Sequence, residues 1–173
     1  MSNTWGDRNC RSRVCDDFMR LEIDSARDLG LDIVQIDDGW QVAGTVYPRA
    51  WDDDGLLFDE HAWDHNVERF PHGIMHLTDK AKSLGVKVGL WFVPASRRCF
   101  ERLEADKEVI TRCYNEYGAR FFKLDMYQAT DKAHTDKMLA LLDSIYSLGD
   151  DVSVQMDVTR YERLNYLCGR EYG

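Results

Sequence analysis

Several side chains that can bind a sugar or act on one stand near the ends of short hydrophobic segments. Carboxylates follow three of these segments: Asp37 and Asp38, Asp125, and Asp157. Trp91 stands near the end of a fourth segment. Carboxylates accept hydrogen bonds from hydroxyl groups, and an indole ring can cover the C–H face of a sugar. This set of residues therefore suits the binding of a polyhydroxylated ring.

The same residue types suit glycoside hydrolysis, in which one carboxylate attacks the anomeric carbon and another group protonates the leaving oxygen. Lys123 lies two residues before Asp125 and therefore on the same face of a strand. Its ammonium group would favour the ionised form of Asp125, which is the form that a nucleophile needs. The alternative is a structural ion pair between Lys123 and Asp125, and the spacing supports both interpretations equally.

The elements that must position these residues repeat along the chain in the order helix, glycine, strand. The repeats are SARDLGLDIVQIDD, DKAKSLGVKVGLWF, RCYNEYGARFFKLD and DSIYSLGDDVSVQMD. Apolar spacing predicts helices near residues 12–29, 74–84, 101–117 and 131–148. It predicts strands near residues 33–37, 86–92, 120–125 and 152–156. Strands that alternate with helices in this way predict a parallel sheet.

Each predicted strand has one apolar face and one face that becomes polar toward its C-terminal end. In residues 120–125, Phe122 and Leu124 oppose Lys123 and Asp125. In a (β/α)8 barrel the apolar face packs against the outer helices, and the inward positions at the C-terminal strand ends form the active site. An open sheet with one face in water is the alternative. We favour an α/β fold with about four to five parallel βα units of a TIM barrel, because a purely structural interior would avoid lysine and aspartate.

The glycines of the repeats also predict the domain organisation. Gly30, Gly85, Gly118 and Gly149 are separated by 55, 33 and 31 residues. The long first interval predicts an insertion loop over residues 41–67, after the second barrel strand. A complete barrel needs about 200 to 250 residues, so we expect residues 1–173 to form a single partial catalytic barrel domain of a larger enzyme.

Composition excludes several classes of protein. The 173 residues carry a net charge of −9, which is unfavourable for binding nucleic acid or an anionic membrane. Five cysteines without a CxxC pair predict neither a disulfide framework nor a zinc site. His72 and His76 are four residues apart but lack a third ligand nearby. We expect no metal or cofactor and, in the absence of a signal segment, a cytoplasmic protein.

Four segments resemble, in order and spacing, the signature segments of the α-galactosidases of glycoside hydrolase family 36. They are DDGW at 37–40, RFPHGI at 69–74, GVKVGLWFVP at 85–94 and KLDM at 123–126. The opening NTWGDRN resembles the end of the first barrel strand of that family. The resemblance extends from about residue 3 to residue 157, and the set of segments is specific although each one alone is not.

The resemblance implies a retaining α-glycosidase that cleaves terminal α-linked galactose, or a related sugar, from an oligosaccharide or glycoside. It places the nucleophile at Asp125, with Lys123 beside it as a substrate-binding group. It places hydroxyl-binding carboxylates at Asp37 and Asp38, and a sugar-contacting ring at Trp91. The acid/base carboxylate of the family would lie on a later strand, so the chain alone is expected to be inactive and to fold poorly or associate.

The chain departs from the family in three places. Val93 stands where the family often has glutamate, and KLDMY replaces the commoner KWDMN. The segment MDVTRYERLNYLCG is not the glycine-rich loop that usually follows the fifth strand. Asp157 and Arg160 lie in this segment and are further candidates for ligand contact, as are Trp5 and Asp7 near the first strand. These departures leave the exact sugar and linkage open.

Two other functions fit the same residues. A lyase or aldolase barrel could use Lys123 in a Schiff base, although a neighbouring carboxylate would keep the lysine protonated. A sugar-binding remnant could retain Asp37, Asp38 and Trp91 without turnover. A nucleotide-binding fold is disfavoured, because no glycine-rich phosphate loop follows a strand. The sequence also leaves open whether the full-length enzyme is a homo-oligomer.

Overall fold

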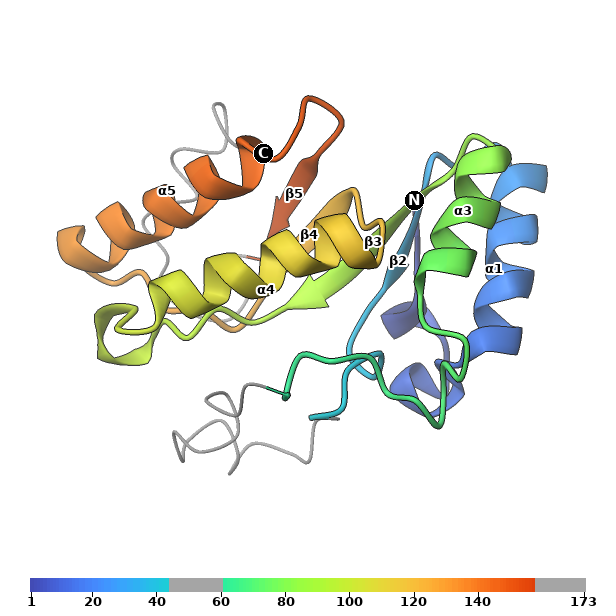
Figure 1. Cartoon of the computed structure of the whole chain (residues 1–173), viewed down its shortest axis with the longest axis horizontal. Coiled ribbons are helices and arrows are strands. Elements are labelled where there is room, and N and C mark those ends of the chain that lie inside the picture. The colour runs from blue at the N-terminus through green and yellow to red at the C-terminus, as the bar shows by residue number, and fades with distance from the viewer. Residues whose placement is uncertain (44–60, 158–173) are drawn as a thin grey trace.

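The computed structural model describes residues 1–43 and 61–157 (Figure 1). In this part of the chain, parallel strands form one sheet in the order β1-β2-β3-β4-β5. The strands are β1 (Ser2–Asn3), β2 (Ile33–Ile36), β3 (Lys87–Phe92), β4 (Phe121–Leu124) and β5 (Ser153–Met156). The sequential order of parallel neighbours is that of a (β/α)8 barrel. It confirms the predicted parallel sheet and the four predicted strands.

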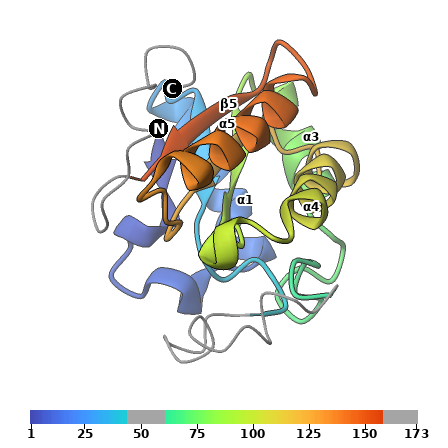
Figure 2. The same cartoon turned by 90° about the vertical axis from the view of Figure 1, so that its left-hand side faces the viewer.

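The α-helices alternate with these strands as predicted. They are α1 (Asp16–Asp28), α3 (Met75–Ser83), α4 (Leu103–Glu116) and α5 (Lys132–Tyr146). Short 3-10 helices occur at η1 (Thr4–Gly6), η2 (Cys10–Arg13) and η3 (Arg97–Cys99). Helices α1 and α3 pack side by side near β2, and α4 and α5 pack together farther along the sheet (Figures 1 and 2). The helix predicted from residue 12 starts later, because its first residues belong to η2.

One face of the sheet packs against the helices and forms the hydrophobic core. The strands contribute fully buried side chains such as Val34, Ile36, Leu90, Phe122 and Leu124. The helices cover them with a second buried set: Met19, Ile23, Leu77, Ala81, Ile110, Leu141 and Leu142. The apolar alternation in the sequence therefore marks the helix-facing side of each strand, as the barrel prediction requires.

The other face is buried from β2 to the start of β4 and partly buried at β5, which argues against an open sheet with one face in water. Gln35, Gly89, Phe121 and Ser153 are register neighbours across β2 to β5. A Cβ atom at Gly89 would lie 2.3 Å from Gln35 Oε1 and 2.5 Å from Phe121 Cδ1. Glycine at this position therefore makes room for two inward side chains in one layer, as in the filled interior of a barrel.

Part of the predicted insertion, residues 44–60, lies outside the described residues. The two ends of the insertion run antiparallel to each other: Val42 N–H donates to Asp64 O at 2.8 Å, and Ala43 N–H donates to Ala62 O at 3.1 Å. Trp63 then packs on Phe92 with ring centroids 4.5 Å apart. The ends of the insertion are thus tied to the C-terminal end of β3.

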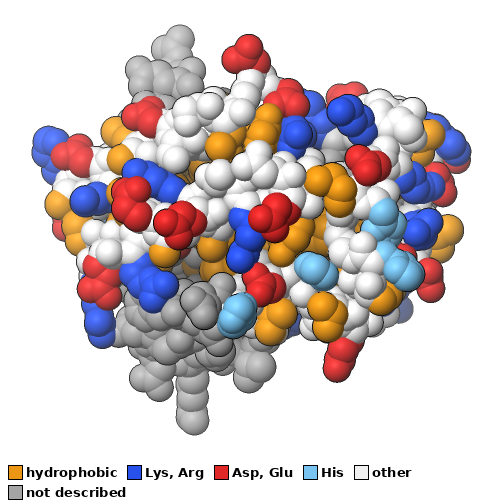
Figure 3. All heavy atoms as spheres, in the orientation of Figure 1, with side chains coloured by type: hydrophobic (Ala, Val, Ile, Leu, Met, Phe, Trp, Pro, Cys, Tyr) orange, Lys and Arg blue, Asp and Glu red, His pale blue; other side chains and the backbone are white. Residues whose placement is uncertain are grey.

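The visible surface mixes charges of both signs with scattered hydrophobic side chains (Figure 3). Within residues 1–43 and 61–157, no helix is both long and apolar enough to cross a membrane.

Candidate active site

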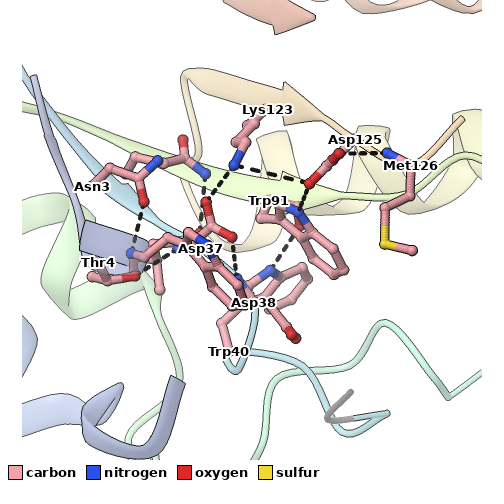
Figure 4. Close-up of polar contacts among 12 residues, drawn as sticks. Asn3, Thr4, Asp37, Asp38, Trp40, Trp91, Lys123, Asp125 and Met126 are labelled. Atoms are coloured by element: carbon pink, nitrogen blue, oxygen red, sulfur yellow. Dashed lines mark hydrogen bonds and ion pairs between the residues drawn. The ribbon is translucent and has the colours of Figure 1, made fainter. Parts of the chain in front are cut away.

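An ion pair joins the ends of two strands that are not adjacent in the sheet. Asp37 directly follows β2, and Lys123 lies on β4. Lys123 Nζ lies 2.9 Å from Asp37 Oδ2, and both side chains are mostly buried (Figure 4). The backbone N–H of Asp37 donates to Thr4 Oγ1 at 2.9 Å. Asp37 and Lys123 therefore meet at the C-terminal edge of the sheet. Thr4, which directly follows β1, holds the backbone of Asp37.

Asp125 directly follows β4 and is held by two N–H donors. Its Oδ1 accepts a hydrogen bond from the backbone N–H of Met126 at 2.6 Å, and its Oδ2 accepts one from Trp91 Nε1 at 3.1 Å (Figure 4). Met126 adopts a left-handed conformation with φ of 51°, which is uncommon for a residue other than glycine. This turn points the Met126 amide back toward the carboxylate that precedes it.

Lys123 contacts both Asp37 and Asp125, and its predicted effect on the ionisation of Asp125 stays a prediction. Lys123 Nζ lies 4.0 Å from Asp125 Oδ2 but only 2.9 Å from Asp37, because Asp37 continues β2 to the level of Trp91 and Lys123. Burial is the largest influence on the pKa of Asp125 and raises it. The hydrogen bond from Trp91 lowers this pKa, and the hydrogen bond and charge of Asp157 raise it. The hydrogen bond from the Met126 amide lowers it. The net direction is upward.

Trp91 is more enclosed than a sugar-stacking platform would be. Its side chain donates to Asp125, and its backbone carbonyl accepts a hydrogen bond from Trp40 Nε1 at 2.9 Å. The Trp63 ring lies beside it with a centroid distance of 6.0 Å, and Trp91 is only 2% exposed. The observed contact of Trp91 is therefore with the Asp125 carboxylate, and its contact with a sugar remains a prediction.

The carboxylate of Asp38 contacts the side chains of Gln41 and Arg11. Gln41 Nε2 donates to its Oδ1 at 2.9 Å, and Arg11 Nη1 lies 3.2 Å from its Oδ2. Gly39, with φ of 118°, allows close approach of Arg11, whose Cβ would lie 2.8 Å from an added Cβ. The DDGW turn thus directs its two carboxylates to different partners, and hydroxyl binding by Asp38 remains a prediction.

The remaining candidates lie at the margins of this edge. The N–H of Asp157 donates to Leu124 O at 2.9 Å, which places Asp157 next to Asp125. Asp7 forms an ion pair with Arg13 at 2.7 Å, and Trp5 is largely exposed. Arg160 lies outside the described residues. Sequence reasoning missed Thr4, because a lone hydroxyl next to a two-residue strand gives no periodic signal.

The histidines predicted not to bind metal lie away from this edge. His72 and His76 are in ring contact at 6.0 Å, and His76 Nε2 pairs with Asp16 across α1 and α3. Within the described part of the chain, no group of three or more histidine, cysteine, aspartate or glutamate residues is arranged to hold a metal ion.

The fold is that of part of a (β/α)8 barrel, and comparison with known proteins identifies the family. The Melibiase family model matches residues 12–111, which is more than half of the chain, so the chain belongs to the Melibiase family. This finding confirms the resemblance to α-galactosidases that the sequence segments suggested.

Solved structures share the fold. The family 36 α-galactosidase AgaA from Geobacillus stearothermophilus superposes with a TM-score of 0.66 at 16% identity, over 89% of this chain and 27% of that one. α-Galactosidase I from Mortierella vinacea gives a TM-score of 0.65 at 20% identity, over 90% of this chain and 39% of that one. These similarities confirm the partial-barrel fold.

Two curated relatives are similar in sequence. α-Galactosidase Mel36A from Lactobacillus acidophilus is 34% identical over 79 residues, which are 46% of this chain and 10% of Mel36A. The α-N-acetylgalactosaminidase of Rattus norvegicus is 29% identical over 146 residues, which are 83% of this chain and 32% of that enzyme. The chain thus spans a tenth to a third of the length of these relatives.

Proposed function

We propose that this chain forms the nucleophile-bearing part of a retaining α-glycoside hydrolase acting on terminal α-linked galactose or a related sugar. One observation carries the proposal: Asp37, Lys123 and Asp125 meet at the C-terminal edge of a barrel sheet, with Lys123 Nζ 2.9 Å from one carboxylate and 4.0 Å from the other. This edge is where barrel enzymes place their active sites. The whole protein would act on an oligosaccharide or glycoside.

Asp125 is the proposed nucleophile. One of its oxygens would form a bond to the anomeric carbon while the bond from that carbon to the leaving oxygen breaks. An acid group, assigned to no described residue, would protonate the leaving oxygen, and water would later release the sugar from the aspartyl ester. The Trp91 and Met126 donors support this role, because they fix the orientation of the carboxylate before substrate arrives.

Lys123 and Asp37 are the proposed hydroxyl-binding pair. An ammonium donates to a sugar oxygen and a carboxylate accepts from a sugar hydroxyl, so adjacent groups can bind neighbouring hydroxyls of one ring. Their ion pair also disfavours the Schiff-base alternative, because Lys123 Nζ is held by Asp37 at 2.9 Å rather than free to attack a carbonyl.

Related structures support the proposed ligand class. AgaA variants have been crystallised in complex with stachyose and with raffinose. The relative from Rattus norvegicus acts on an N-acetylated sugar according to its name. We therefore propose an α-linked galactose-type sugar and leave its substituent at carbon 2 open.

Covalent labelling tests the proposal on the chain itself. An α-galactosyl fluoride has a leaving group that needs little protonation, so labelling does not depend on the acid group. We expect mass spectrometry to find one galactosyl group esterified to Asp125, and no such adduct in the Asp125→Asn variant. The exposed Asp136 on α5 provides the control, because Asp136→Asn should label normally.

Absence of any adduct on a chain that urea titration shows to be folded, or an adduct that persists in Asp125→Asn, would contradict the nucleophile assignment. Saturable galactose binding without an adduct would instead support the sugar-binding alternative.

A further inference from the structure

Left-handed backbone conformations gather in the two loops that flank the candidate nucleophile. Among the described residues other than glycine, positive φ angles occur at Arg98, Cys99 and Phe100, after β3, and at Met126, after β4. Such conformations are unfavourable and persist only where the surrounding structure holds them. Contacts with the surrounding structure must therefore hold these two loops.

Two buried side chains connect the loops. Asp106 lies in the first turn of α4, is 6% exposed, and its Oδ2 accepts a hydrogen bond from Ala95 N–H at 2.9 Å. Ser96 is 2% exposed, and its Oγ accepts a hydrogen bond from Gln128 N–H at 2.7 Å. The first contact ties the loop after β3 to α4, and the second ties the loop after β4 to the loop after β3.

The second contact lies close to the candidate nucleophile along the chain. Gln128 follows the fully buried Tyr127, which follows Met126, whose N–H donates to Asp125 at 2.6 Å. A shift of Gln128 would be transmitted through this short buried segment to the left-handed turn at Met126. The position of the Met126 amide, and with it the hydrogen bond to Asp125, therefore depends on Ser96.

We propose that Asp106 and Ser96 are positioning residues that form a two-step brace: Asp106 fixes residues 94–96, and Ser96 fixes the turn that orients the Asp125 carboxylate. The hydrogen bond at 106 supports this role, because a buried backbone N–H without an acceptor is costly and Asp106 supplies the acceptor for Ala95. That the brace serves catalysis rests on the proposed function of Asp125 as nucleophile. That the brace orients the Asp125 carboxylate does not rest on that function.

The brace can be tested by NMR on the whole chain, without any activity assay. In Ser96→Ala we expect the Gln128 amide to exchange at least about tenfold faster with solvent, because it has lost its acceptor. We also expect the carboxyl carbon of Asp125 to titrate about half a pH unit higher or more, because a weaker Met126 bond stabilises the ionised form less. Ser96→Thr keeps the hydroxyl and should restore both values.

Asp106 is tested by a matched pair of variants. Asp106→Asn retains an oxygen that can accept from Ala95, whereas Asp106→Leu does not. We expect the leucine variant to reproduce the effects of Ser96→Ala and the asparagine variant to resemble the wild type. Thr78→Ala is the control, because it removes a buried hydroxyl that binds Met75 O on the distant helix α3, and it should move neither value.

A folded Ser96→Ala variant with unchanged Gln128 exchange and an unchanged Asp125 titration would overturn the brace, even if Asp106→Leu fails to fold. Equal effects of Thr78→Ala would also overturn it. The result is separate from galactosyl labelling: a working brace without an adduct would refute only the proposed function, and an adduct with a failed NMR test would refute only the brace.

Discussion

At the scale of single residues, opposing contributions set the pKa of Asp125. Burial and Asp157 raise its pKa, and the N–H donors of Trp91 and Met126 lower it. A more basic carboxylate is a stronger nucleophile once ionised, while the two donors fix its direction. The sequence could reveal the carboxylate but not this balance, because Asp157 and Trp91 arrive from neighbouring strands.

Replacing Trp91 with phenylalanine tests the donor. Trp91→Phe keeps an aromatic ring but removes the N–H that lies 3.1 Å from Asp125 Oδ2. We expect the pKa of Asp125 to rise further. We also expect galactosyl labelling to slow by about tenfold, the effect of losing roughly 1.4 kcal/mol, because the carboxylate is no longer held in direction by this donor. Trp63→Phe changes a neighbouring indole that does not donate to Asp125, so it should alter labelling much less; equal slowing would contradict the donor role.

The Lys123–Asp37 pair makes a separate prediction about stability. Lys123→Met leaves the buried Asp37 carboxylate without its cationic partner, and we expect urea titration to show a loss of about 3 to 5 kcal/mol. Adding Asp37→Asn removes the uncompensated charge and should recover part of this loss. A double variant as unstable as the sum of the two single variants would show that the pair is not energetically coupled.

At the scale of secondary structure elements, the period of the sequence accounts for most of the fold. Alternation of period two and helical spacing predicted the strands, helices and parallel order, because side-chain direction follows directly from backbone geometry. Contacts that depend on the stagger between strands were not predictable. The sequence placed Lys123 beside Asp125, and the register also brings it to Asp37 at the end of β2, which the sequence did not indicate.

Contacts from loops were also missed. Trp63 encloses Trp91 from the far end of an insertion, and Asp106 and Ser96 hold loops that carry no periodic pattern. Nothing in the spacing of these residues indicates their partners, since loop paths are set by tertiary packing rather than by local preference.

Gly89 shows how strand register limits the choice of residue. Gly89→Ala would place a Cβ atom against Gln35 and Phe121, which are packed in the same layer. We expect the unfolding free energy to fall by about 1 to 3 kcal/mol through overpacking, measured by urea titration. Gly6→Ala is the control, because its added Cβ meets nothing within 4 Å. Equal stability of the two variants would show that the layer is loosely packed.

At the scale of the whole molecule, buried carboxyl groups make stability depend on pH near neutrality. Burial raises the pKa of Asp106 to about 7, and the net effect of burial and Asp157 also raises the pKa of Asp125. In the unfolded chain these carboxyls ionise near pH 4. Above about pH 4, and for Asp106 up to about pH 7, these two groups therefore bind more protons in the folded state than in the unfolded state, and their contribution to stability falls as pH rises.

Asp106→Asn isolates the largest of these contributions, because an amide stays neutral at every pH while Asp125 is unchanged. The stabilising contribution of protonated Asp106 is fully present below about pH 4 and is lost as pH rises to about 7. Relative to the wild type, we therefore expect the variant to change little at pH 4 and to gain stability at pH 8, on the order of 4 kcal/mol. Urea titrations at pH 4, 6 and 8 measure this difference, and the exposed Asp136→Asn provides a control with no such trend. Parallel pH profiles for wild type and Asp106→Asn would mean that Asp106 is ionised in the folded protein at acidic pH, and that water or an unrecognised cation compensates its burial.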